Sequence, residues 1–383
     1  MRNSLINILI LLLLLSACSM SRQKLSPQAN LYLKSANVYY QQKDNETSLN
    51  KALALYTKVL EDNPYHVIAL KRSADILLYF ASQIEPKETK DDDGNPVYPN
   101  MDNAAKAISY FRQTYGKYDS VLTAINTFEK LNDDDRAMKR DATRKKESSW
   151  VRLYKIGQLY YHTNDYPEAI KTLEMVFNLD SSRKEPLRML VLAYQETGDQ
   201  DKIEFYLNKV LADNPDDLEM IKMMGAHYYK NNDYAKAIEY FNKVLEKEPL
   251  NTNNMLLIYA AYSLQKDYQS AYDVLVKVLK LDPENKEVLG YAKDLAIALG
   301  NKPAEIDYWK RILALDPSLE NIENYCFRMI RIENYDGVMP YAEKWFQKDP
   351  TNKDAVSVCV LIASKIGRKD LEKKYSDIFK SMK

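Results

Sequence analysis

The sequence predicts an all-α solenoid in which tandem pairs of antiparallel helices stack on one another. Tyrosines recur every 34 positions, at Tyr160, Tyr194, Tyr228 and Tyr262. Prolines recur with the same period, at Pro215, Pro249, Pro283 and Pro317. A fixed period of this length indicates a repeat protein whose units bury their apolar faces only against neighbouring units. Glycine is scarce, at 9 of 383 residues, which suits helices better than sheets with many tight turns.

Residues 218–251 show the pattern of one unit. The first helix carries a stripe whose spacings of three, one and three fit a 3.6-residue period: Ile221, Met224, Gly225 and Tyr228. Gly225 is expected to let the neighbouring helix approach closely. Residues 231–233 end this helix and cap the next, because short polar side chains accept bonds from the free amides at a helix start. The second helix is expected to face inward at Ala237, Phe241 and Val244.

This unit resembles the tetratricopeptide repeat, which has a small residue midway along its first helix, a tyrosine three residues later and an alanine early in its second helix. The resemblance covers nearly all of the chain after its amino-terminal segment, except residues 83–100 and 119–148. It implies a right-handed superhelical solenoid of about nine helix pairs. Two units depart from the pattern, because Lys293 and Phe327 stand where Gly225 stands in its own unit. We expect those two units to pack less tightly or in a shifted register.

The repeats fall into segments along the chain. Residues 29–118 are interpreted as amino-terminal helix pairs with a loop insertion at 83–100, and residues 150–352 as a regular array. Residues 353–383 are expected to form capping helices with a polar outer face. The segment 119–148 begins with an amphipathic helix and continues with alternating charges from Asp133 to Glu147. It is either one long exposed helix or a degenerate repeat, and alternating signs favour a solvated helix.

A secretion signal precedes the repeats. Residues 1–4 are positively charged, and the apolar run of residues 5–15 is too short to cross a bilayer of ~30 Å as a helix. Residues 15–18, Leu-Ser-Ala-Cys, resemble the lipobox of bacterial lipoproteins. The resemblance implies cleavage after residue 17, palmitate-type acyl chains on Cys18 and a tether over residues 18–28. No aspartate directly follows Cys18, which favours the outer membrane by the sorting rule of enteric lipoproteins. An ordinary secretory signal with a chance cysteine is the alternative.

Composition and motifs bear on several classes of function. Lys+Arg 54 balances Asp+Glu 54, which argues against nucleic-acid binding. The common nucleotide, hydrolase and zinc-protease motifs do not occur in the sequence, so we expect no catalytic residues and no cofactor. The three histidines lie in separate units, and no metal site is expected. Cys326 and Cys359 are one repeat apart, on helices ~8–10 Å apart, whereas a disulfide needs Cα atoms within ~7 Å. We interpret both as small buried hydrophobic residues.

The groove of related repeats is lined by the outer faces of the first helices. Mapped onto this sequence, the groove is predicted to contain Tyr154, Gln158, Tyr161, Arg188, Gln195, Lys222, Tyr229 and Asn253. Aromatic anchors beside cations suit an extended peptide or a partner helix. The function predicted is that of a lipid-anchored scaffold, facing the periplasm, that binds envelope proteins during assembly of a membrane complex. The alternative is a small-molecule or glycan carrier, or a cell-wall enzyme, that uses the same groove.

Overall fold

The computed structural model describes residues 23–43 and 45–382, which are mostly helical. The chain divides into two compact units, Met1–Asp213 and Asn214–Lys383, and each is described by itself. The predicted signal segment 1–17 and Cys18 lie outside the described residues. Among the residues that are described, no helix combines the length and apolar character needed to cross a bilayer.

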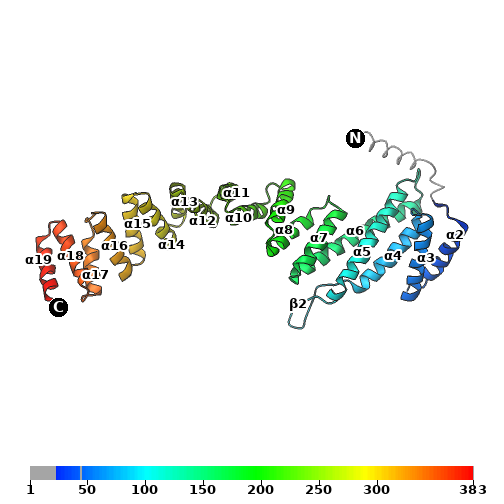
Figure 1. The fold of residues 1–383 in the computed structure, drawn as a ribbon, viewed down its shortest axis with the longest axis horizontal. Coiled ribbons are helices and arrows are strands. Elements are labelled where there is room, and N and C mark those ends of the chain that lie inside the picture. Colours follow the sequence, from blue (N-terminus) through cyan, green and yellow to red (C-terminus); the bar gives the residue numbers. More distant parts are fainter. Residues whose placement is uncertain (1–22, 44, 383) are drawn as a thin grey trace. The chain divides into compact units, whose positions relative to one another are not determined.

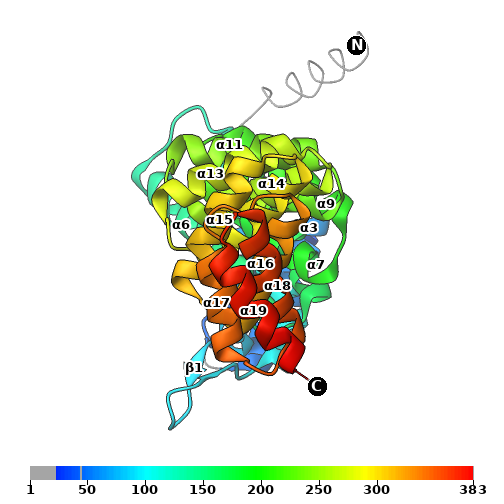
Figure 2. The same ribbon diagram turned by 90° about the vertical axis from the view of Figure 1, so that its left-hand side faces the viewer.

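The described residues of unit 1 form four antiparallel helix pairs and one hairpin, and each helix packs on the next along the chain (Figure 1). The helices are α2 (Pro27–Tyr40), α3 (Glu46–Asp62), α4 (Val67–Ile84), α5 (Ala104–Ile125), α6 (Asp133–His162), α7 (Tyr166–Leu179), α8 (Glu185–Thr197) and α9 (Gln200–Asp213). Between α4 and α5 lie strands β1 (Thr89–Lys90) and β2 (Pro96–Val97) and the 3-10 turn η2 (Met101–Asn103). The hairpin projects away from the helices of this unit (Figure 2). Residues 83–100 therefore form an exposed insertion.

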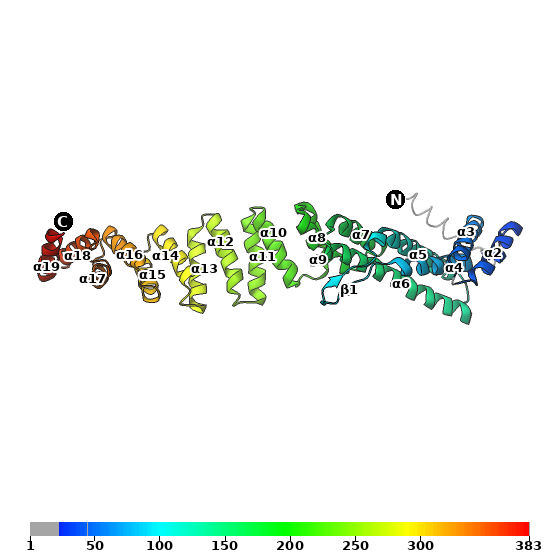
Figure 3. The same cartoon turned by 90° about the horizontal axis from the view of Figure 1, so that it is seen from below.

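Unit 2 consists of five further helix pairs. Figure 3 shows α10 to α13 side by side, with successive helices antiparallel. The helices are α10 (Leu218–Lys230), α11 (Tyr234–Lys247), α12 (Thr252–Leu264), α13 (Tyr268–Leu281), α14 (Lys286–Ala298), α15 (Lys302–Leu315), α16 (Leu319–Arg331), α17 (Met339–Lys348), α18 (Lys353–Lys365) and α19 (Lys369–Ser381). The described part of the chain thus contains the nine helix pairs that the repeat period predicts.

The turn inside each regular pair combines a left-handed residue with a capping side chain. Positive φ values recur at Asn164, Gly198, Asn232, Lys266, Gly300, Glu333 and Gly367. Glycine and asparagine tolerate this backbone conformation best. The periodic aspartates follow directly, and each accepts a bond from the amide three residues later: Asp165, Asp199, Asp233 and Asp267. The recurring aspartate is therefore the amino-terminal cap of the second helix, as predicted at Asp233.

The packing of residues 218–251 confirms the predicted stripe. Ile221, Met224 and Tyr228 are buried on α10, and Phe241 on α11 is 1% exposed. A Cβ atom added to Gly225 would lie 2.6 Å from the ring of Phe241. The glycine therefore makes room for a ring of its own pair's second helix. The prediction of close approach at Gly225 is correct, and the contacting group is this aromatic side chain.

One turn of unit 2 is a residue shorter than its counterparts. The first helices are capped by Asp217, Asn251, Asn285, Ser318 and Asn352. These caps are 34 residues apart except for the 33 between Asn285 and Ser318, and Ser318 directly follows Pro317. The residue equivalent to Gly225 is therefore the buried Cys326, and the assignment of Phe327 to this position is wrong by one residue, because Phe327 is 43% exposed.

The predicted position of Lys293 and the predicted burial of the two cysteines agree with the structure. Lys293 occupies the position of Gly225, and its ammonium lies 4.5 Å from the ring centroid of Trp309, which takes the place of Phe241. This contact is a cation–π interaction. Cys326 and Cys359 are free and buried, and burial raises the pKa of each thiol to about 12. Both behave as small core residues.

Candidate functional site

A recess of about 590 Å³ opens on the first-helix side of unit 1. It is lined by α2, the turn after α2, α3, α4 and α6: Tyr40, Lys43, Leu49, Lys71, Asp75, Ile76, Leu78, Tyr79, Ser82, Lys145 and Arg152. We call this cavity the Asp75 recess. Most of its lining comes from the first helices of the pairs, α2, α4 and α6. On α4, Lys71, Asp75 and Tyr79 line the recess together because residues four apart on a helix share a face.

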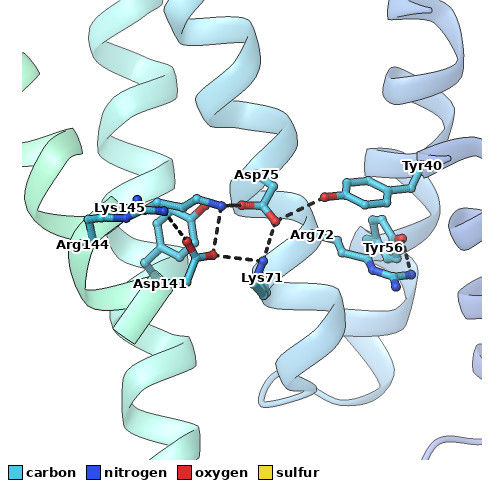
Figure 4. Close-up of polar contacts among 9 residues, drawn as sticks. Tyr40, Tyr56, Lys71, Arg72, Asp75, Asp141, Arg144 and Lys145 are labelled. Carbon is cyan, nitrogen blue, oxygen red and sulfur yellow. Dashed lines mark hydrogen bonds and ion pairs between the residues drawn. The ribbon is translucent and has the colours of Figure 1, made fainter. Parts of the chain in front are cut away.

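Asp75 is the centre of the polar contacts in this recess (Figure 4). Its Oδ1 accepts hydrogen bonds from Lys145 Nζ at 2.6 Å and from Tyr118 Oη at 2.5 Å. Its Oδ2 accepts from Lys71 Nζ at 2.9 Å and from Tyr40 Oη at 3.3 Å. The donors come from α2, α4, α5 and α6, so one carboxylate joins four helices. Charge-assisted bonds of this kind are among the stronger ones in proteins.

A second carboxylate completes the network. Asp141 on α6 lies 3.3 Å from Lys71 Nζ and 3.0 Å from Lys145 Nζ. Each of these two lysines therefore contacts two carboxylates, and the four charges alternate in sign around a closed ring (Figure 4). Arg144 pairs with Asp141 at 2.9 Å from the outer side. The charges balance within the ring, and Arg144 adds a positive charge beside it.

The ionisation of the network follows from burial and contacts. Burial alone would raise the pKa of Asp75, but hydrogen bonds from Lys145, Tyr118 and Lys71 outweigh it and hold this pKa below its ordinary value. Burial would also raise the pKa of Asp141, but hydrogen bonds from Lys145 and Arg144 outweigh it and lower this pKa to about 2. Burial and then the charge of Asp75 raise the pKa of Tyr40 to about 12, and they also raise that of Tyr118. Both carboxylates are ionised and both phenols protonated at neutral pH.

A second recess of about 570 Å³ adjoins the first, since Arg152 lines both. It is formed by the segment before the hairpin and by the carboxyl-terminal half of α6: Glu85, Pro86, Lys87, Glu88, Arg152, Lys155, Ile156, Gln158, Leu159 and His162. We call it the Arg152 recess. Arg152 Nη1 lies 3.3 Å from Glu85 Oε2, yet this buried nitrogen forms no hydrogen bond within the described residues. The guanidinium also stacks over the ring of Phe111, with Cζ 5.5 Å from its centroid.

Five of the predicted groove residues belong to unit 1. Gln158 lines the Arg152 recess. Tyr154 is half-buried between pairs, stacks on Trp150 at 5.6 Å and donates a hydrogen bond to the carbonyl of Glu185. Tyr161 packs edge-on against Tyr166 at 5.6 Å. The two others, Arg188 and Gln195, lie on α8. Tyr154 and Tyr161 are therefore engaged in packing within the unit, whereas Gln158 borders an open cavity.

The remaining three predicted residues belong to unit 2. Lys222 on α10 pairs with Glu248 at 3.0 Å, and Tyr229 packs edge-on against Tyr234 at 5.6 Å. Asn253 on α12 is exposed. The predicted set thus has five members in unit 1 and three in unit 2.

Sequence reasoning missed the Asp75 network altogether. Three of the four donors to Asp75 lie 35, 43 and 70 residues from it in the sequence, and none of these separations is a multiple of the repeat. The charged segment 133–148 supplies Asp141 and Lys145. That segment is the first half of the 30-residue helix α6, which continues without a break into the next repeat. The sequence does contain one indication that this helix packs against the unit. Ala142 and Ser149, which are both buried, are seven residues apart, or about two turns on one face of a helix.

The residues of these recesses do not suggest a metal centre. Within the described ranges, no group of three or more His, Cys, Asp or Glu side chains is placed to hold an ion. The acidic turn Asp91–Asn95 is the exposed tip of the hairpin, where Asp91 accepts bonds from the amides of Asp93 and Asn95. Both recesses are lined by several cations, and the Asp75 recess also has the rings of Tyr40 and Tyr79.

Comparison with known proteins identifies the repeat. Models of the tetratricopeptide repeat match residues 153–180 and residues 221–251. No curated protein matches the sequence. Among solved structures, MamA from Desulfovibrio magneticus RS-1 is 20% identical, with a TM-score of 0.37, and the match covers 44% of this chain and 96% of that chain. A MamA structure labelled AMB-1 is 24% identical with a TM-score of 0.39, covering 45% and 94%. The two repeat matches lie one in each compact unit and coincide with helix pairs α6–α7 and α10–α11. The chain therefore contains tetratricopeptide repeats.

Proposed function

We propose that this protein is a membrane-anchored scaffold that binds protein partners through the Asp75 and Arg152 recesses of unit 1. The observation that carries the proposal is the pair of adjoining recesses on the first-helix side, at the position where repeats of this family present their groove. Concave sites with a few convergent polar groups are the usual binding sites of proteins. The helices that line them are fixed by the Asp75 network, so the surface is preorganised for a partner.

The charge of the two recesses favours a partner segment that carries carboxylates. Four cations and one carboxylate line the Asp75 recess: Lys43, Lys71, Lys145 and Arg152 against Asp75. Three cations and two carboxylates line the Arg152 recess. Arg152 borders both recesses, and its side chain is 34% exposed. A carboxylate of a partner would bond to the exposed part of this guanidinium, and charge-assisted bonds to arginine add both strength and direction.

The anchoring and the location of the scaffold belong to the same proposal. Leu-Ser-Ala-Cys at residues 15–18 supports acylation of Cys18, and attachment of more than one acyl chain gives lasting membrane binding. The protein would then face the periplasm, from the outer membrane, and take part in assembly of an envelope complex. Envelope proteins with an acidic periplasmic segment are the partners that this arrangement would hold.

Affinity purification from detergent-solubilised envelopes tests the proposed site. Lys43→Glu combined with Lys155→Glu reverses one exposed cation at each recess and leaves the Asp75 network intact. Because opposed charges would then face the partner, recovery of the main partner should fall on the order of tenfold. Lys34→Glu combined with Lys130→Glu is the matched control, since both lysines are exposed and neither lines a recess.

Equal recovery with both double variants would refute the proposed site. Retention of the wild-type protein on a glycan column, with no protein partner recovered, would favour the alternative of a carrier. Circular dichroism of each variant checks that the helices remain folded.

A further inference from the structure

The residues just before α2 are held firmly on the turn between α3 and α4. Gln23 Nε2 donates a hydrogen bond to the carbonyl of Tyr65 at 3.2 Å, and Gln23 Oε1 accepts from the amide of Val67 at 3.1 Å. Asn63 Nδ2 donates to the carbonyl of Lys24 at 3.1 Å. The amide of Ser26 donates to Asp62 at 3.0 Å, and this bond lowers the pKa of that carboxyl. Residues 23–26, predicted to belong to a tether, are in fact part of the folded unit.

These bonds satisfy groups that a helix end leaves open. The amide of Val67 is the first of α4, and the first amides of a helix have no partner within the helix. Gln23 fills this need from outside the helix, while His66 accepts from the amide of Ala69 at 3.2 Å. The described residues of unit 1 therefore begin at a defined place, beside the start of α4.

The distance from this place to Cys18 is short. Only residues 19–22 lie between Cys18 and Gln23, and five Cα-to-Cα steps reach at most about 18 Å even when fully extended. An acyl chain on Cys18 would lie in the bilayer, with the cysteine backbone at its surface. The start of α4 would then be no farther than this from the membrane surface.

Two large apolar side chains are exposed at the same place. Tyr65, whose carbonyl accepts from Gln23, is 52% exposed, and Ile68 in the first turn of α4 is 41% exposed. The exposed charged residues around them have both signs: Lys24, Glu61 and Asp62. Tyrosine is well suited to the membrane–water interface because its ring is apolar and its hydroxyl polar.

We propose that the α3–α4 turn is the membrane-facing edge of unit 1, with Tyr65 and Ile68 resting in the headgroup region of the bilayer that holds the anchor. The occupant of this apolar surface is the lipid interface, because the length of chain between Cys18 and Gln23 leaves the edge within reach of it. The inference rests on the lipid anchor of the proposed function. It adds an orientation that the anchor alone does not give.

This orientation brings the binding recess close to the membrane. Lys71 follows Ile68 by one turn of α4, which advances the helix axis by about 4.5 Å, and Asp75 lies about 10 Å beyond Ile68. The Asp75 recess therefore begins close to the α3–α4 turn, the proposed membrane-facing edge. A partner would have to present its acidic segment next to the bilayer surface, as a membrane protein does with residues that adjoin its membrane-spanning part.

Fluorescence quenching by brominated lipid tests the orientation. Full-length acylated protein carrying Tyr65→Trp is placed in vesicles whose lipids bear bromine near the headgroup. The matched control is Tyr79→Trp, which is 41% exposed and lies about 18 Å along the axis of α4 from Val67, the first residue of that helix. The native tryptophans Trp150, Trp309 and Trp345 are all buried, and the wild-type protein supplies their background signal. We expect the Tyr65→Trp signal to be quenched several-fold more strongly than the Tyr79→Trp signal.

A second variant separates the orientation from the anchor. A flexible glycine–serine linker of about 20 residues, inserted between Arg22 and Gln23, has a root-mean-square span of about 25 Å. The protein with this linker should still float with the vesicles but lose most of the extra quenching at position 65. Flotation with equal quenching at positions 65 and 79 would overturn the orientation and leave the anchor standing. Failure of the acyl-competent wild type to float would overturn both.

Discussion

At the scale of single residues, the repeat sequence determines the core and says little about the charged network. The stripe at Ile221, Met224, Gly225 and Tyr228 could be predicted because every repeat places the same contacts at the same spacing. Asp75 could not, because its partners come from an insertion-bearing unit and from the start of α6, where the period is broken. Tyr154 and Tyr161 were assigned to an open groove from their helical phase alone. The structure engages both in packing, since neighbouring rings and a carbonyl lie within reach.

Phe241 tests the shared core. Phe241→Ala should lower the free energy of unfolding by on the order of 3–5 kcal/mol, because the ring is 1% exposed and fills the space over Gly225. Adjoining repeats should lose protection from hydrogen exchange as well, since stability is shared between neighbours. Phe205→Ala is the control, because Phe205 is 50% exposed. A loss below ~1 kcal/mol for Phe241→Ala would mean that the burial described is incorrect.

Asp75 tests the ionic ring through its pH dependence. A carboxyl whose pKa is lowered on folding stabilises the protein fully above its ordinary pKa, and this stabilisation is lost as pH falls toward the folded value. Wild-type protein should therefore lose stability between about pH 4 and pH 2. Asp75→Asn should be less stable at pH 7, on the order of 3 kcal/mol. The difference between the two proteins should shrink as pH falls through this window.

Thermal melts at pH 7, 5, 3 and 2.5 measure this effect. Asp133→Asn is the control, because the Asp133 side chain is 97% exposed and contacts only Arg136 among the ion pairs of the described chain. A constant difference between Asp75→Asn and wild type across the whole range would rule out an ionised Asp75 as the source of the stabilisation.

At the scale of elements, the long helix α6 shows where sequence pattern is ambiguous. Alternating charge from Asp133 to Glu147 favours a solvated helix, and most of these side chains are exposed or half-buried. The same segment also packs Ala142 against α4 and α5 and supplies two members of the ionic ring. One face therefore belongs to the core, although the mean composition of the segment is highly polar.

Thr143 distinguishes an integral helix from an exposed appendage. Thr143→Pro removes an amide from the middle of α6, which costs about 3 kcal/mol or more in a helix interior. The ring residues Asp141 and Lys145 flank this position, so the thermal unfolding of unit 1 should move to lower temperature. Thr143→Ala, which keeps the helix, should have little effect. If both variants melt alike, the first half of α6 contributes nothing to the stability of the unit.

At the scale of the whole molecule, the sequence predicts the kind of fold and leaves the grouping of its helices open. The 34-residue period predicts nine pairs, and the described chain contains them. The array predicted for residues 150–352 as one run is divided after Asp213 into two compact units. The period is unbroken there, because Tyr194 and Tyr228 keep their spacing, so no repeat position marks the boundary.

The last prediction concerns how the whole molecule is attached. Cys18→Ala should leave the protein without acyl label and release it from the membrane fraction, because Leu-Ser-Ala-Cys provides the acceptor thiol. Cys326→Ala is the matched control, since that thiol is buried with its pKa raised to about 12 and does not act as a nucleophile at neutral pH. Labelling should therefore persist in Cys326→Ala and vanish in Cys18→Ala. If Cys18→Ala retains both label and membrane association, the attachment lies elsewhere, and the α3–α4 turn is no longer held within reach of the bilayer by Cys18.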